Sequence, residues 1–151
     1  LVGTNPYSFE RLVRAADEYA AAFGERMLIQ LGNTDYIPKH AEYKRFLERE
    51  ELLSSIRNAD LIITQGGFGS IADCLRENKK VVAVPRKPEL KEAPDRQEEL
   101  VRELDGLGRL VGVYDIADLP VAIKRAFSTE FETSQKHNIG ELVREFIKDN
   151  D

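Results

Sequence analysis

A cluster of three glycines is the feature of this sequence best suited to ligand chemistry. Between Ile63 and Ser70 an apolar run ends, the chain turns, and a helical period begins. Glycines permit positive φ and let a ligand approach the backbone closely. Free amides at the start of the new helix favour an anion such as a diphosphate. The pattern predicts an anion cradle, although a tight turn without a ligand would use the same glycines; its residues are Gly66, Gly67, Phe68, Gly69 and Ser70.

A carboxylate follows this loop at Asp73, within the first turn of the expected helix. Its functional interpretation is a side chain that accepts hydrogen bonds from ribose hydroxyls. Ser70 and Asp73 also have the spacing of a capping box, which contributes about 1 kcal/mol to a helix. Both roles remain open from the sequence. Cys74 shares a helix face with Ile71 and Leu75, so we expect it to fill the core.

A second polar pair, Asp95 and Gln97, stands at the start of a later helix. Asp95 and Glu98 have capping-box spacing, and Pro94 comes just before them. Alternatively, Asp95 and Gln97 point at the hydroxyls of a sugar. Gln97 favours the second interpretation, because capping requires no Gln at that position.

The amino-acid composition argues against several classes of function. The chain has 151 residues and a net charge of −5, which argues against nucleic acid as a partner because phosphate binding needs a basic face. One Cys and two His predict no metal site. The basic residues of segment 79–96 are diluted by acidic ones, so we expect a solvated face, although they could meet a diphosphate or an anionic lipid. No apolar run approaches the roughly 20 residues of a membrane span, and no signal peptide is visible, so we expect a cytoplasmic protein.

The elements that position these loops alternate between strand and helix. Parallel crossovers need a helix-length connection, so the alternation predicts an α/β fold with a doubly wound parallel sheet in a single domain, residues 1–151. Ligands bind such sheets beyond the carboxyl ends of the strands. Leu1 to Thr4 reads as the end of a strand, so we expect a first strand that is truncated. The expected strands are 27–31, 43–47, 61–63, 81–84 and 110–113, and the expected helices are 9–23, 50–58, one after 70, 96–104, 119–127 and 139–147; segment 86–94 is expected to be an exposed loop.

The order of six short segments gives the chain a family resemblance. Together they resemble the glycosyltransferase family 28 C-terminal domain, in its stand-alone small-subunit branch. The likeness covers nearly the whole chain. It depends on the order and spacing of all six segments, since no single segment is specific for the family. The segments are LVGT at 1–4, IQLGNT at 29–34, ADLIIT at 59–64, GGFGSI at 66–71, VAVPR at 82–86 and DRQEEL at 95–100.

This resemblance implies a Rossmann-like fold, the donor half of a GT-B glycosyltransferase, that binds a UDP-sugar and needs no other cofactor and no metal. The family's diphosphate loop corresponds to Gly67–Ser70, and its ribose-binding acid corresponds to Asp73, where Glu is usual. Its sugar-contacting residues correspond to Asp95 and Gln97. Relatives often carry a His near that Gln, whereas this chain has Ala93-Pro94 and Arg96 there. Gly3 and Thr4 correspond to a loop that faces the cleft.

The resemblance also implies partners. The acceptor half would come from a membrane-associated subunit, which would supply the general base and recruit this chain to the inner face of the membrane. The acceptor would be a lipid-diphosphate-linked sugar, and the reaction would be an inverting transfer of a hexose-type sugar. A non-catalytic α/β interaction or regulatory module is the alternative, motivated by the missing base and the altered surroundings of Asp95. The apolar row of helix 139–147 could face a partner or pack on its own sheet.

Overall fold

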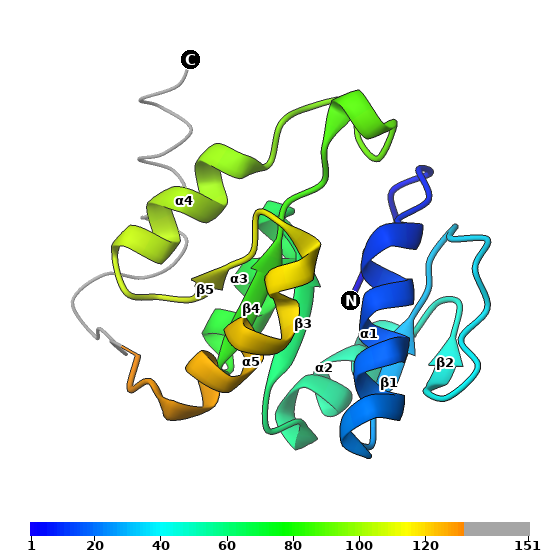
Figure 1. The fold of residues 1–151 in the computed structure, drawn as a ribbon, viewed down its shortest axis with the longest axis horizontal. Helices are drawn as coiled ribbons and strands as arrows, with labels where there is room; N and C mark the ends of the chain where they lie inside the picture. Colours follow the sequence, from blue (N-terminus) through cyan, green and yellow to red (C-terminus); the bar gives the residue numbers. More distant parts are fainter. Residues whose placement is uncertain (132–151) are drawn as a thin grey trace.

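Helices and strands alternate over residues 49–128 as the sequence predicts (Figure 1), whereas the strands at 28–30 and 42–44 follow one another without a helix between them. The structure, a computed structural model, describes residues 1–131. The strands are β1 (Leu28–Gln30), β2 (Glu42–Lys44), β3 (Ile62–Gln65), β4 (Val81–Val84) and β5 (Val111–Gly112). The helices are α1 (Glu10–Phe23), α2 (Arg49–Asn58), α3 (Phe68–Arg76), α4 (Glu98–Gly106) and α5 (Leu119–Ser128), with short 3₁₀ turns at Pro88–Leu90 and Ile116–Asp118. The predicted helix 139–147 and His137 lie outside the described residues.

All strand pairs are parallel, which confirms the predicted α/β arrangement. The strands form a two-stranded sheet, β1-β2, and a three-stranded sheet, β3-β4-β5. In the larger sheet Ile62 lies opposite Val81, and Val82 lies opposite Val111. Parallel register brings the carboxyl ends of β3 and β4 to one edge, where the loops after Gln65 and Val84 emerge together.

The core covers both faces of the larger sheet, and β4 shows this directly. Val82 and Val84 pack into a cluster with residues of α1 and α5. Val81 and Ala83 face the opposite way, into a cluster with residues of α3 and α4. A strand buried on both faces reads as a continuous apolar run, which is why this strand was predictable residue for residue.

Helix boundaries differ from the prediction at the two candidate capping boxes. Helix α3 begins at Phe68, so Gly67 is its N-cap and Ser70 is already inside the helix. Helix α4 begins at Glu98 with Gln97 as its N-cap. Gly67 has no side chain to cap α3, and the Gln97 side chain makes no capping hydrogen bond to α4. Both capping-box predictions are therefore wrong. Strand β2 also ends at Lys44, three residues before the predicted end.

A buried carboxylate at Asp17 fixes the loop between β1 and β2. Asp17 lies on α1 with 1% of its surface exposed. Its oxygens accept hydrogen bonds from the amides of Lys39, His40 and Ala41 at 2.8–2.9 Å. The Tyr36 hydroxyl donates a further one at 3.0 Å. Burial alone would raise the pKa of Asp17, but these donors outweigh it and lower that pKa to about 2.

We expect Asp17→Asn to lower the free energy of unfolding by about 2 kcal/mol at pH 7, because a shift of one pKa unit is worth about 1.4 kcal/mol. The folded pKa lies below the unfolded value of about 3.9, so this stability is present above pH 4 and is lost as the pH falls from 4 to 2. Urea unfolding between pH 2 and 7 measures both effects. Asp35→Asn, at an exposed position of the same loop, is the control. A loss below 0.5 kcal/mol for Asp17→Asn would contradict this account.

Candidate functional site

Three loops meet at the carboxyl edge of the larger sheet: residues 1–7, 65–70 and 85–97. The side chain of Gln65 lies where the first two meet. A Cβ atom placed on Gly3 would come within 2.3 Å of Gln65 Nε2, and one placed on Gly67 within 2.9 Å. Gly3 also has a φ of +74°, which only glycine adopts without strain. Glycines at these positions thus let both loops close around one amide side chain.

The side chain of Arg86 bonds residues of all three loops. Its guanidinium donates to the carbonyl of Val2 at 2.6 Å, to that of Tyr7 at 3.0 Å and to that of Glu92 at 2.8 Å. Its Nε donates to Gln65 Oε1 at 2.5 Å. Arg86 has only 1% of its surface exposed, so the prediction of an exposed loop is wrong here and at Glu92. The planar guanidinium meets four acceptors at once because its donors spread in a fixed fork.

The surroundings of Arg86 fix its protonation and its position. Burial lowers the pKa of Arg86 to about 10, which leaves the side chain positively charged at pH 7. The ring of Phe9 lies 4.8 Å from its guanidinium carbon, a cation–π distance. Within residues 1–131, the hydrogen-bond partners of the Arg86 guanidinium are backbone carbonyls and the Gln65 amide oxygen, and no carboxylate is hydrogen-bonded to it.

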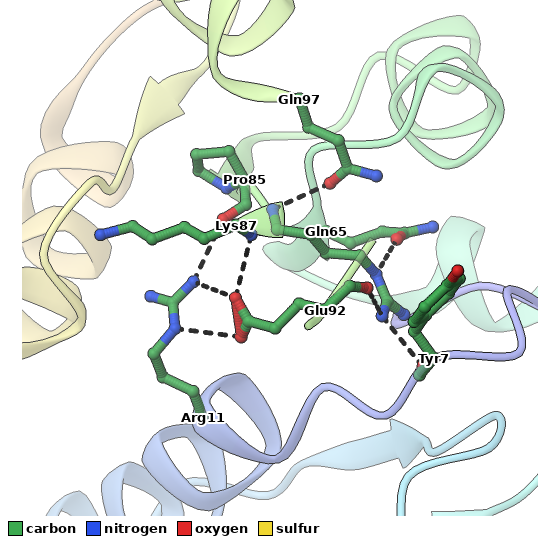
Figure 2. Close-up of polar contacts among 8 residues, drawn as sticks. Tyr7, Arg11, Gln65, Pro85, Lys87, Glu92 and Gln97 are labelled. Atoms are coloured by element: carbon green, nitrogen blue, oxygen red, sulfur yellow. Dashed lines mark hydrogen bonds and ion pairs between the residues drawn. The ribbon is translucent and has the colours of Figure 1, made fainter. Parts of the chain in front are cut away.

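A second set of bonds ties the 85–97 loop to α1 (Figure 2). The carboxylate of Glu92 accepts from Arg11 Nη2 at 3.0 Å and from the Lys87 amide at 3.0 Å. Arg11 also donates to the Pro85 carbonyl at 3.1 Å. Gln97 closes the loop, since its Oε1 accepts from the Arg86 amide at 2.9 Å. Gln97 Nε2 lies 3.5 Å from where a Cβ on Gly67 would stand, so the amide group of Gln97 adjoins the glycine-rich loop.

The first turn of α3 forms the candidate anion cradle. The amides of Phe68, Gly69 and Ser70 begin the helix, where backbone N–H groups have no partner within the helix. Phe68 and Gly69 are exposed, and a Cβ on Gly69 would meet no atom within 4 Å. Ser70 Oγ accepts a long bond of 3.4 Å from Gln65 Nε2. The cradle is thus open to solvent on one side and linked through Gln65 to Arg86 on the other.

Asp73 lies beside this cradle, at a small pocket of about 70 Å³. Its carboxylate pairs with Arg49 through two bonds of 2.6 and 2.8 Å. Arg49, 24 residues away and largely exposed, was not predicted to belong to the site. Four predicted site residues line the pocket, together with five that were not predicted. The predicted ones are Gly3, Thr4, Ser70 and Asp73, and the others are Leu1, Gln30, Phe46, Leu47 and Leu52.

Gln30 could have been predicted as a site residue from the sequence, because it is a polar residue in an otherwise apolar strand. It is buried and its amide bonds the backbone of Gly3 on one side and of Arg45 on the other. Asp95, in contrast, is exposed in the bend before α4 and does not line the pocket. The structure therefore brings Gly3, Thr4, the glycine-rich loop, Asp73 and Gln97 together and leaves Asp95 at the surface.

The sequence profile of the glycosyltransferase family 28 C-terminal domain matches residues 1–149. The chain belongs to this family. Its fold is similar to that of the glycotransferase of kitacinnamycin, with a TM-score of 0.64 and 19% identity over 95% of this chain. It is also similar to the glycosyltransferase SnogD from Streptomyces nogalater, with a TM-score of 0.53 and 17% identity over 99% of this chain. This family 28 domain spans 37% and 43% of those two chains.

These similarities confirm the predicted family and fold, a Rossmann-like C-terminal half of the GT-B type. No curated protein has a significantly similar sequence. Among residues 1–131, no helix of this family 28 domain is long and apolar enough to cross a membrane. In the same residues no group of His, Cys, Asp or Glu is arranged to hold a metal ion.

Proposed function

We propose that this family 28 domain is the UDP-sugar-binding subunit of a two-part inverting glycosyltransferase. The observation that carries the proposal is the position of the Asp73 pocket directly beside the open first turn of α3. A nucleoside diphosphate needs both parts, an anion cradle for its phosphates and a hydrogen-bond acceptor for its ribose. The family supports a sugar nucleotide as the ligand that combines them.

Each part of the donor has a candidate partner in the site. The amides of residues 68–70 and the helix dipole would hold the diphosphate, with Ser70 Oγ as an additional donor. Asp73 would accept from the ribose hydroxyls. Phe46, Leu47 and Leu52 give the same pocket apolar walls, which suit the faces of a base. Gln97 would reach the transferred sugar from beside Gly67.

In the proposed reaction an acceptor hydroxyl attacks the anomeric carbon as the bond from that carbon to the diphosphate breaks. The departing UDP carries the electron pair and gains negative charge, which the amides at the start of α3 would stabilise. The hydroxyl proton passes to a general base, which we assign to the partner subunit. The acceptor is a lipid-diphosphate-linked sugar and the partner a membrane-associated subunit, in line with the small-subunit branch that the sequence resembles.

The alternative function is a non-catalytic interaction module that keeps the fold. It is favoured by one observation, that both oxygens of Asp73 already bond Arg49. A carboxylate has about four lone-pair sites, however, so this ion pair leaves acceptor capacity for ribose hydroxyls. Calorimetric titration with UDP, UDP-glucose and UDP-N-acetylglucosamine separates the two functions. We expect binding of UDP and of at least one UDP-sugar; absence of any UDP binding, with an acceptor subunit present as well, would contradict the donor-subunit proposal.

Asp73→Asn is expected to weaken UDP binding at least tenfold while changing the free energy of unfolding by less than about 1 kcal/mol. A hydrogen bond to a charged group contributes about 1.5–3 kcal/mol, and the ion pair with the exposed Arg49 contributes little to stability. Arg49→Gln is the matched control, because it breaks the same ion pair and leaves the carboxylate in place. Its UDP affinity is expected to stay within about threefold of the unmodified chain. Equal losses of affinity in both variants would assign the effect to the ion pair.

A further inference from the structure

The side chains of Gln65 and Gln97 both adjoin Gly67. A Cβ placed on Gly67 would lie 2.9 Å from Gln65 Nε2 and 3.5 Å from Gln97 Nε2. Figure 2 shows both amide nitrogens turned to the same side of the site. Because residue 67 is glycine, no side chain of its own fills this space, and a ligand oxygen placed there would be close to hydrogen-bond distance from both nitrogens. We call this space the Gly67 notch.

Arg86 fixes which end of each carboxamide faces the notch. Its Nε donates to Gln65 Oε1 at 2.5 Å, and its backbone amide donates to Gln97 Oε1 at 2.9 Å. A guanidinium and a backbone N–H can only donate, so neither carboxamide can turn its nitrogen toward Arg86 without losing that bond. Among residues 1–131, Gln97 Nε2 has no hydrogen-bond partner, and Gln65 Nε2 has only the long bond of 3.4 Å to Ser70 Oγ. Both side chains therefore offer N–H donors to the notch and keep their oxygens turned toward Arg86.

Acceptors of the three loops at this edge are taken by arginine side chains. Four carbonyl oxygens accept from a guanidinium: those of Val2, Tyr7 and Glu92 from Arg86, and that of Pro85 from Arg11. The carboxylate of Glu92 forms an ion pair with Arg11 at 3.0 Å, which leaves the positive charge of Arg86. The arrangement therefore favours a ligand group that accepts hydrogen bonds and is also an anion.

We propose that the Gly67 notch binds a carboxylate of the transferred sugar, so that the sugar nucleotide of the proposed reaction is a UDP-hexuronic acid. This inference rests on the proposed function and names the class of its sugar. Gly67 comes just before the amide cradle of residues 68–70, whereas Asp73 lies about one turn further along α3. A sugar nucleotide with its ribose at Asp73 and its diphosphate at the cradle therefore brings its sugar to the notch, beside Gln97.

The chemistry of sugar substituents selects the carboxylate. A hydroxyl that accepts from an N–H still has a proton to donate, and an acetamido group has an N–H to donate, so at the notch both would face donors. A carboxylate has only acceptors, about four lone-pair sites, and hydrogen bonds to a charged group are the stronger ones. The positive charge of Arg86 adds to the preference for an anion. The exposed neighbours Asp95 and Arg96 carry opposite charges and leave this balance unchanged.

Calorimetric titration with UDP, UDP-glucose and UDP-glucuronate tests the sugar class. We expect UDP-glucuronate to bind at least about tenfold more tightly than UDP-glucose, because the two differ only in the carboxylate that replaces a hydroxymethyl group. If UDP binds but UDP-glucuronate has no advantage over UDP-glucose, this inference is wrong and the proposed function stands. If UDP itself does not bind, the proposed function is wrong and the inference falls with it.

Gln97→Glu is expected to remove the preference without unfolding the chain. The new carboxylate can still accept from the Arg86 amide, while its second oxygen would repel a carboxylate in the notch. A negative charge at the N-cap of α4 is favourable, so we expect Tm to stay within about 3 °C. The affinity for UDP-glucuronate is expected to fall at least about tenfold, and that for UDP-glucose to stay within about threefold.

Arg96→Gln is the matched control, because it lowers the net charge by the same amount at the neighbouring, exposed position. We expect it to keep the ratio of the two affinities within about threefold of the unmodified chain, since an exposed charge is screened by solvent. An equal loss of the preference in this control would assign the effect to net charge and not to the notch. An equal fall for both nucleotides in Gln97→Glu would place the diphosphate in the notch, and either result would overturn the proposal.

Discussion

Arg86→Met is expected to lower the free energy of unfolding by about 3–5 kcal/mol and to abolish measurable UDP binding. Met has a similar reach and fits an apolar environment, so the loss reports the missing hydrogen bonds. Four oxygen acceptors, on Val2, Tyr7, Glu92 and Gln65, would lose their buried donor. A buried polar group left unsatisfied costs about 1–3 kcal/mol, and partial access of water to the loops reduces the sum. The three loops that form the site would also lose their common anchor.

Arg86→Lys separates charge from geometry. Lysine keeps the positive charge, but its ammonium is a compact point and not a planar fork. We expect it to recover less than half of the lost stability. Arg102→Met is the surface control, since that guanidinium is 58% exposed in its ion pair with Glu98. Urea unfolding gives the stabilities, and titration with UDP at low denaturant gives the affinities. A loss below 1 kcal/mol for Arg86→Met, or full recovery with Lys, would show that the four bonds do not hold the loops together.

The elements predicted most accurately from the sequence are those whose boundaries are set by their own residues and by the residues next to them. Val81–Val84 is apolar on both faces and is followed by Pro85, so its strand was predicted to the residue. Helix α1 ends where Gly24 takes a φ of +64°, as the glycine after its apolar period indicates. The start of α3 was placed too late because Ser is a common N-cap. In the structure the turn at Gly66 and Gly67 is complete before Phe68, and Ser70 Oγ accepts from Gln65 instead.

Only the part of the candidate site that depends on backbone conformation was predicted from the sequence. The glycine-rich loop is visible in the sequence, but the groups that hold it are not. Arg86 stands in a segment of charged residues, and such segments are usually exposed. Its burial arises only when loops from residues 1–7 and 65–70 converge on it. Arg49 likewise reaches Asp73 across 24 residues, through the packing of α2 beside α3. No local pattern contains such contacts.

Gly66→Ala and Gly69→Ala, two substitutions in a single loop, are expected to change the free energy of unfolding very differently. A Cβ on Gly66 would lie 2.8 Å from Val101 Cγ2 and 2.9 Å from Pro85 Cα. The Val101 side chain can yield, but Pro85 Cα belongs to the backbone that carries Arg86. We therefore expect Gly66→Ala to lower the free energy of unfolding by about 3 kcal/mol, at the upper end for overpacking. Urea unfolding with comparison of m-values measures it.

Gly69→Ala changes the same loop by the same methyl group and is expected to have the opposite sign. Its Cβ would meet nothing within 4 Å, and the position lies inside α3, where Ala is favoured over Gly by up to about 1 kcal/mol. The contrast separates the two reasons for glycine in this loop. At Gly66 the neighbouring strand-end backbone excludes a side chain, whereas at Gly69 the folded chain leaves space, as a ligand cradle requires. Similar losses of stability in both variants would mean that the whole loop is sterically closed, and the proposed diphosphate position would then have to be abandoned.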